Sequence, residues 1–182
     1  MSWRLSRFDG QPIKRMSAAT VAGQVSQADS MRLNFTSSTT EVPAGFVNDL
    51  GQIYGPRGNT LTFGWSQDNR VNARDRNSPT SPDEQHDSFI QIPSRALHGV
   101  SWSIAVANGT YRVHLAAGDP KKTSGVFKIN VNGVLAIHGK PTKSAHWVEN
   151  TVTVVVTGGK ITVAGARGAV QNKINFIEIT RS

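Results

Sequence analysis

The sequence predicts an all-β protein, a two-sheet jelly-roll β-sandwich that follows an N-terminal extended arm. From Met31 onward, strand-length runs of alternating apolar and polar residues are separated by turn residues, and no amphipathic helix reaches three turns. Tight-turn dipeptides separate three pairs of runs: Asn108-Gly109, Asn132-Gly133 and Gly158-Gly159. About eight strands joined by hairpins and long loops are typical of two packed sheets. The length of 182 residues suffices for one hydrophobic core.

The N-terminal residues 1–30 differ from the rest and read as a basic arm. They hold four scattered cations, Arg4, Arg7, Lys14 and Arg15, followed by a weak helix candidate that Gly23 interrupts. Terminal arms become ordered when something binds them, so we expect residues 1–30 to contact other protein subunits. Residues 31–182 then form the sandwich domain.

The first half of the sandwich is rich in loops. Its first strand, 31–35, alternates apolar and polar residues, and the stretch 41–87 that follows is dense in Gly, Pro, Asn and Asp. Only short strands near 52–54 and 61–65 interrupt that stretch. A loop-rich region of this length inside a domain is either functional or packed by its own aromatic side chains.

The second half contains clear strand patterns. The expected strands are 88–92, 100–106, 110–116, 126–131, 134–138, 150–157, 160–164 and 173–180. In the second of these, Val100, Trp102, Ile104 and Val106 share one face and are expected in the core. The three tight turns predict three hairpins, which join 100–106 to 110–116, 126–131 to 134–138, and 150–157 to 160–164.

Composition narrows the chemistry and the partners. The absence of cysteine excludes disulfides, zinc-thiolate sites and a cysteine nucleophile. The formal net charge of +8 favours anionic partners, but there is no basic helix or RNA-binding aromatic motif, so nucleic acid is not favoured. No apolar run reaches the length of a membrane span, so we expect no membrane partner. The N-terminus lacks the apolar region of a signal peptide. Removal of a leader and assembly into a particle both remain open, and the localisation is unknown.

Several motifs follow one another in a characteristic order between Met31 and Thr180. They include 42–54, Phe63-Gly-Trp-Ser66, Asn108-Gly-Thr-Tyr111 and Ala116-Ala-Gly-Asp119. This series resembles that of galactose-binding-like, malectin-like carbohydrate-binding jelly rolls, modules also found beside rhamnogalacturonan acetylesterases. The resemblance implies a sandwich fold, a non-catalytic role, and glycan binding through loops at one edge or on a concave face.

Candidate ligand-binding residues gather in the loop-rich stretch. Sugars are bound by an aromatic face together with planar amide or carboxylate groups. Residues of these types are Tyr54, Phe63, Trp65, Asp68 and Asn69, and Trp147 is a candidate wall of another site. The alternatives remain open, because Trp65 also fits a core position beneath loops and Trp147 also fits a cap on the sandwich.

The acidic cluster Asp83, Glu84 and Asp87 offers hard oxygen ligands for a structural Ca²⁺, although its spacing is not that of an EF-hand. A solvated loop is the alternative for this cluster. No nucleophile elbow, zinc-protease helix motif or phosphate-binding loop is found. Gly118-Asp119-Pro120 has proline where the companion esterases would need serine. We therefore expect no catalytic residues and no enzyme activity.

The sequence predicts a non-catalytic carbohydrate-binding module for glycan recognition or attachment. The alternative is a structural virion protein, a capsid decoration or fibre component that uses a lectin-like sandwich and the arm 1–30 for assembly.

Overall fold

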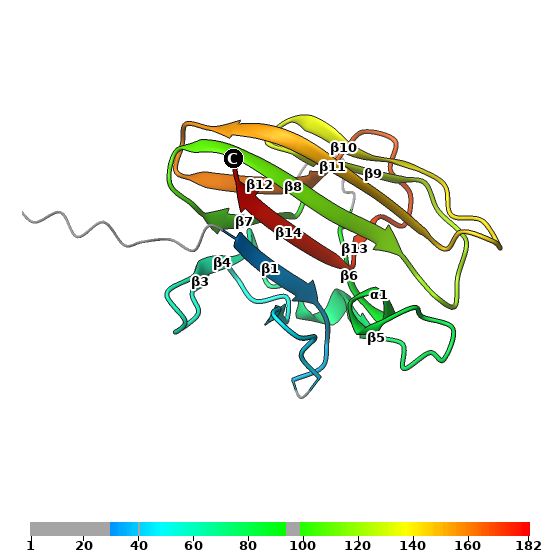
Figure 1. Ribbon diagram of the computed structural model, residues 1–182. Helices are drawn as coiled ribbons and strands as arrows, with labels where there is room; N and C mark the ends of the chain where they lie inside the picture. Colours follow the sequence, from blue (N-terminus) through cyan, green and yellow to red (C-terminus); the bar gives the residue numbers. More distant parts are fainter. Residues whose placement is uncertain (1–29, 40, 94–98) are drawn as a thin grey trace, which may run out of the picture.

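Two large sheets pack face to face in the computed structural model, which describes residues 30–39, 41–93 and 99–182 (Figure 1). The five-stranded sheet has the order β11-β8-β14-β1-β2 and the six-stranded sheet the order β10-β9-β12-β7-β4-β3. A third, three-stranded sheet has the order β13-β6-β5. The predicted all-β sandwich is confirmed.

The strands of the described residues have the following bounds. They are β1 (Ser30–Phe35), β2 (Val47–Asp49), β3 (Gly55–Pro56), β4 (Thr62–Trp65), β5 (Ala73–Asp75), β6 (Ser88–Gln91), β7 (Ser101–Ala105), β8 (Gly109–Gly118), β9 (Phe127–Val131), β10 (Val134–Gly139), β11 (Trp147–Val156), β12 (Lys160–Gly165), β13 (Lys173–Ile174) and β14 (Phe176–Arg181). A 3₁₀ helix η1 (Arg70–Asn72) and a short helix α1 (Glu84–Asp87) interrupt the loops. No helix in these parts of the chain is long and apolar enough to cross a membrane.

The first and last described strands, β1 and β14, are neighbours in the five-stranded sheet. Figure 1 shows β1 and β14 side by side, and they pair antiparallel from Ser30 opposite Thr180 to Asn34 opposite Phe176. The first described strand therefore begins at Ser30. The rest of the predicted arm lies outside the described residues, and its role stays a prediction.

One of the three predicted hairpins is confirmed and two are wrong. β9 and β10 pair around Asn132-Gly133 as predicted. In contrast, β7 belongs to the six-stranded sheet and β8 to the five-stranded one, and β11 and β12 are divided in the same way. Their turns therefore cross between sheets. The two crossings bond to each other, because Val106 N donates to the Gly159 carbonyl oxygen at 3.0 Å and Gly159 N donates to Asn108 Oδ1 at 2.9 Å.

A buried carboxylate links the two sheets through the core. Asp49, at the end of β2, is fully buried and accepts from Trp65 Nε1 at 2.9 Å and from Trp102 Nε1 at 2.7 Å. Gly51 N donates to the same carboxylate at 2.7 Å. Burial raises the pKa of Asp49, and these three donors oppose that rise. The carboxylate thus joins β2 of one sheet to β4 and β7 of the other.

A second buried group lies just after β8. Asp119 is fully buried and accepts from Arg76 at 2.7 and 3.1 Å, with Lys173 Nζ 3.4 Å away. The Lys173 ammonium also lies 4.6 Å from the centre of the Phe89 ring. Burial acts to raise the pKa of Asp119, but the hydrogen bonds from Arg76 and Lys121 N and the charge of Lys173 together outweigh it, so the pKa is lowered. Asp119 therefore has a structural role here.

Candidate functional site

Two of the aromatic ligand candidates belong to the core, so their predicted stacking role is wrong. Phe63 and Trp65 are fully buried, because β4 is an internal strand and both side chains point to its inner face. The ring of Trp65 meets Phe35 edge-on at 5.9 Å, and its N–H is used by Asp49. Neither ring offers a face to a ligand, and the core alternative holds for Trp65.

The polar candidates beside them are also engaged within the protein. Asn69 is 1% exposed; its amide nitrogen donates to the Gln91 carbonyl oxygen at 2.9 Å and its oxygen accepts from Asn72 at 2.6 Å. Its predicted ligand role is therefore wrong. Asp68 is exposed and pairs with Arg70 at 2.5 Å. The Arg70 hydrogen bonds lower the pKa of Asp68 to about 2.

Tyr54 is the sequence-predicted aromatic that faces solvent, with 41% of its surface exposed. It lines a shallow pocket of about 260 Å³. We call this the Tyr54 pocket, and its lining residues are Tyr54, Gly64, Ser66, Ser101, Ser103 and Lys160. Ser101 and Ser103 lie on the side of β7 opposite the buried Trp102 and Ile104, so the pocket opens on the outer face of the six-stranded sheet.

Backbone bonds hold Tyr54 beside β4. Tyr54 N donates to the Trp65 carbonyl oxygen at 2.8 Å, and Trp65 N donates to the Gln52 carbonyl oxygen at 2.9 Å. This close approach requires glycine at position 64, which has φ +139°, because a Cβ there would lie 2.6 Å from the Gln52 oxygen. The Gly-Trp pair therefore shapes the pocket through the glycine, while the tryptophan supports it from the core.

Small hydroxyl groups form the floor of the Tyr54 pocket. Ser66 N donates to the Ser101 carbonyl oxygen at 2.8 Å, and Ser101 N donates to Ser66 Oγ at 3.1 Å. The hydroxyls of Ser103 and Thr162 lie 3.0 Å apart on neighbouring strands. These residues are not among the sequence-predicted candidates, although serines that alternate with Trp102 and Ile104 are the available signal for an outward polar face.

Trp147 lies against the five-stranded sheet and packs as a cap. It is partly buried, its Nε1 donates to the His86 carbonyl oxygen at 3.1 Å, and its ring meets His86 edge-on at 5.4 Å. A Cβ at Gly118 would lie 2.6 Å from Trp147 Cγ, so the indole rests directly on β8. This packing favours the capping role over a wall that stacks against a sugar.

A row of ion pairs crosses the outer face of the five-stranded sheet from Trp147. His86 Nε2 lies 2.9 Å from Glu149, and Glu149 lies 3.3 Å from His114. His114 lies 3.0 Å from Glu178, which pairs with Arg32 at 2.5 Å. We call these five side chains the ion-pair row. A second groove of about 270 Å³ lies along it, lined by Arg112, His114, Thr151, Glu178 and Thr180.

The predicted calcium ligands Asp83, Glu84 and Asp87 line one open pocket, but two of them already accept hydrogen bonds within the protein. Asp83 caps α1 by accepting from His86 N at 3.1 Å. Asp87 is 4% exposed and accepts from Ser78 N at 2.9 Å and from Ser81 Oγ at 2.5 Å. Asp87 also lies beside Asp75, so the predicted calcium role of Asp83, Glu84 and Asp87 stays a prediction.

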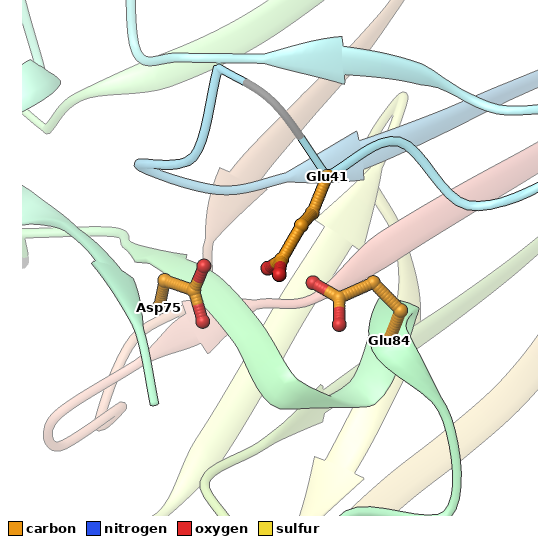
Figure 2. A group of neighbouring side chains, drawn as sticks. All are labelled: Glu41, Asp75 and Glu84. Carbon is orange, nitrogen blue, oxygen red and sulfur yellow. The ribbon is translucent and has the colours of Figure 1, made fainter. Parts of the chain in front are cut away.

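Glu84 instead meets Glu41 and Asp75, which come from separate parts of the chain (Figure 2). One oxygen from each of the three carboxylates lies within 4.8 Å of the others. Burial and the repulsion of neighbouring acids, Glu41 first, raise the pKa of Glu84 to about 7. Glu84 Oε1 is buried and has no hydrogen-bond partner among the described residues. Three carboxylates with no ion-pair partner in the described part of the chain suit a hard cation such as Ca²⁺.

No protein-family model and no curated protein sequence matches this chain. Solved structures do match it. A Bacillus subtilis protein, YXIM, has a TM-score of 0.57 at 18% identity over 84% of this chain and 40% of its own. A calcium-binding mutant of Bacteroides uniformis β-glucuronidase 2 has a TM-score of 0.58 at 12% identity, over 84% of this chain and 18% of its own.

The plant receptor-like kinase FER has a TM-score of 0.54 at 14% identity, over 84% of this chain and 42% of its own. The chain therefore shares a β-sandwich fold with part of each of these three proteins. At these identities the likeness concerns the fold, and the chain spans less than half the length of each of the three proteins. The resemblance predicted from the motifs is confirmed at the level of the fold.

Proposed function

We propose that this chain is a non-catalytic carbohydrate-binding module that holds a glycan in the Tyr54 pocket. The observation that carries the proposal is the position of an exposed tyrosine beside a floor of serine hydroxyls. A tyrosine face packs against the C–H groups of a sugar ring, and hydroxyls exchange hydrogen bonds with its hydroxyl groups. The resemblance of the motifs to non-catalytic glycan-binding modules is consistent with the proposal.

The residues around the pocket favour binding over catalysis. Its lining contains serine, glycine, tyrosine and lysine, and no carboxylate or imidazole that could exchange a proton with a substrate. Of the histidines in the ion-pair row, His114 lies on the other sheet and His86 in α1, and their ring nitrogens face carboxylates of the protein itself.

The test is glycan binding by Tyr54→Ala and Tyr54→Phe, measured on a glycan array and then by calorimetry with the sugars that bind. We expect Tyr54→Ala to weaken binding about tenfold or more, because the stacking face is lost, and Tyr54→Phe to retain most of it. Val71→Ala is the control, since Val71 is 79% exposed and lies outside the pocket. Unchanged affinity of folded Tyr54→Ala would exclude the Tyr54 pocket as the site.

The alternative role, a structural virion component that assembles through residues 1–30, depends on a segment that lies outside the described residues apart from Ser30. It stays a prediction, as does the contact of that arm with other subunits. The predicted calcium site at Asp83, Glu84 and Asp87 also stays a prediction, and we propose that Glu41 and Asp75 would hold such an ion together with Glu84.

A further inference from the structure

The positive charge of this protein comes from its second half. Residues 1–87 hold nine lysines and arginines and nine acidic residues, whereas residues 88–182 hold eleven lysines and arginines and three acidic residues. The formal net charge of +8 is therefore carried by residues 88–182. Most strands of the six-stranded sheet come from this half of the chain.

The three acidic residues of the second half are all paired away from the six-stranded sheet. Asp119 is buried with Arg76 and Lys173. Glu149 and Glu178 belong to the ion-pair row on the five-stranded sheet. The strands of the six-stranded sheet themselves contain no aspartate or glutamate. The outer face of this sheet carries Lys128 and Lys160, the charged residues of its strands, and no carboxylate of the same strands neutralises them.

Two cations of this face lie at the Tyr54 pocket. Lys160 lines the pocket, and Arg57 lies over Gly64, where a Cβ would collide with its guanidinium. Neither forms an ion pair within 4.0 Å in the described part of the chain. Arg57 is held in place, because its Nη2 donates to the Ile53 carbonyl oxygen at 2.6 Å and its guanidinium lies 5.1 Å from the centre of the Phe63 ring. Lys160 remains available for an external anion.

We infer that the Tyr54 pocket selects glycans that carry carboxylates, such as polyuronates, and that Lys160 binds the carboxylate while Tyr54 packs against the ring. This inference rests on the proposed function and adds the charge of the sugar to it. The ammonium of lysine is a point charge on a flexible stem, so it can follow a carboxylate on a repeating polymer. A positive face also attracts a polyanion over a distance of about 8 Å at physiological ionic strength.

A nucleic acid is a poorer fit to the same face. Single strands are held by several stacked aromatic side chains along a basic groove, and duplexes by many phosphate contacts. The Tyr54 pocket offers one exposed aromatic ring, one lysine and a floor of serines. This composition matches a sugar ring with a single carboxylate.

The experiment compares polygalacturonate with its methyl ester, which has the same backbone without the charge, by calorimetry on the full chain. We expect the wild type to bind the acid at least about tenfold more tightly than the ester. Lys160→Met should remove about tenfold of the affinity for the acid and leave the affinity for the ester unaffected. Lys143→Met is the matched control, because Lys143 is an exposed lysine outside the pocket and its loss changes the net charge equally.

The outcomes separate the inference from the proposed function. Equal losses in Lys160→Met and Lys143→Met, or equal binding of duplex DNA, would mean general attraction of polyanions and would overturn the inference. Equal binding of acid and ester, lost in Tyr54→Ala, would overturn the inference and leave the proposed function intact. Binding of neutral sugars without binding of the acid would likewise overturn the inference alone. If no glycan binds, both fail.

Discussion

The two outer faces of the sandwich differ in how their polar groups are satisfied. On the five-stranded sheet, His86, Glu149, His114, Glu178 and Arg32 form one continuous row of ion pairs. On the six-stranded sheet, the Tyr54 pocket presents hydroxyls, an exposed aromatic ring and a lysine without an ion-pair partner in the described residues. A ligand on the first face must compete with existing pairs, whereas a ligand on the second supplies the missing partner. A binding face is therefore better recognised by polar groups that lack a partner within the protein than by the presence of charge.

The largest expected effect is on stability, and it tests whether the buried Asp49 carboxylate joins the two sheets. Asp49→Ala leaves two buried indole N–H groups without an acceptor, and we expect unfolding to become easier by about 3 kcal/mol or more. Asp49→Asn retains one carbonyl acceptor and should lose less. The midpoint of urea unfolding measures both. Asp68→Ala is the control, because the exposed pair with Arg70 contributes little. A stable Asp49→Ala would mean that the sheets are joined without this carboxylate.

A smaller effect concerns Glu41, Asp75 and Glu84, which have no ion-pair partner in the described part of the chain. In this they differ from the carboxylates of the ion-pair row. The pKa of Glu84 is about 7 in the folded protein against an ordinary 4.5. Between these values the folded chain keeps a proton that the unfolded chain has released, so stability falls as pH rises from about 4.5 to about 7. Glu84→Gln should remove this dependence, as read from melting temperatures across that range.

The addition of Ca²⁺ is a second test of the cluster formed by Glu41, Asp75 and Glu84. We expect Ca²⁺ to raise the melting temperature at a pH of about 7.5 more than at a pH of about 5, because protonated Glu84 competes with the ion. At a hundredfold excess over the Kd, the gain is about 2.7 kcal/mol. Glu84→Gln should weaken the response and Asp68→Asn should preserve it. A melting temperature that ignores calcium at both pH values would exclude a cation site at Glu41, Asp75 and Glu84.

The smallest expected effect tests directly whether the glycan binds to the six-stranded sheet and not to the five-stranded one. Glu149→Gln removes the carboxylate that meets both His86 and His114, and we expect a loss of about 1 kcal/mol in stability with unchanged glycan affinity. Denaturant unfolding and calorimetry with the bound glycan measure the two quantities. Loss of glycan binding in this variant, with Tyr54→Ala still binding, would move the site to the five-stranded sheet.

Part of the candidate site could be predicted from the sequence. Tyr54 stands out because it belongs to a loop-rich stretch, and it is exposed at a pocket. Ser66, Ser103 and Lys160 could not be joined to it, since they come from separate segments that become neighbours only in the folded sheet. Glu41 and Asp75 likewise meet Glu84 only in the folded chain. Trp65 was predicted as a ligand-binding residue but is buried. The Gly-Trp motif fits an exposed ring and a buried one equally well, so the sequence could not decide between them.

The sequence by itself determined the longer strands, their inward faces and the positions of the turns, because alternation and glycine act over a few residues. It did not predict the short strands β2, β3 and β5 of the loop-rich stretch. It placed Trp102 and Ile104 in the core and located the turns at Asn108-Gly109 and Gly158-Gly159. Only the tertiary structure decided that these two turns cross between sheets. A half-buried strand carries the same alternation in either sheet, so its pattern does not record which sheet it joins. Packing of the two apolar faces against each other made that choice, and with it the pairing that leaves one outer face satisfied and the other open.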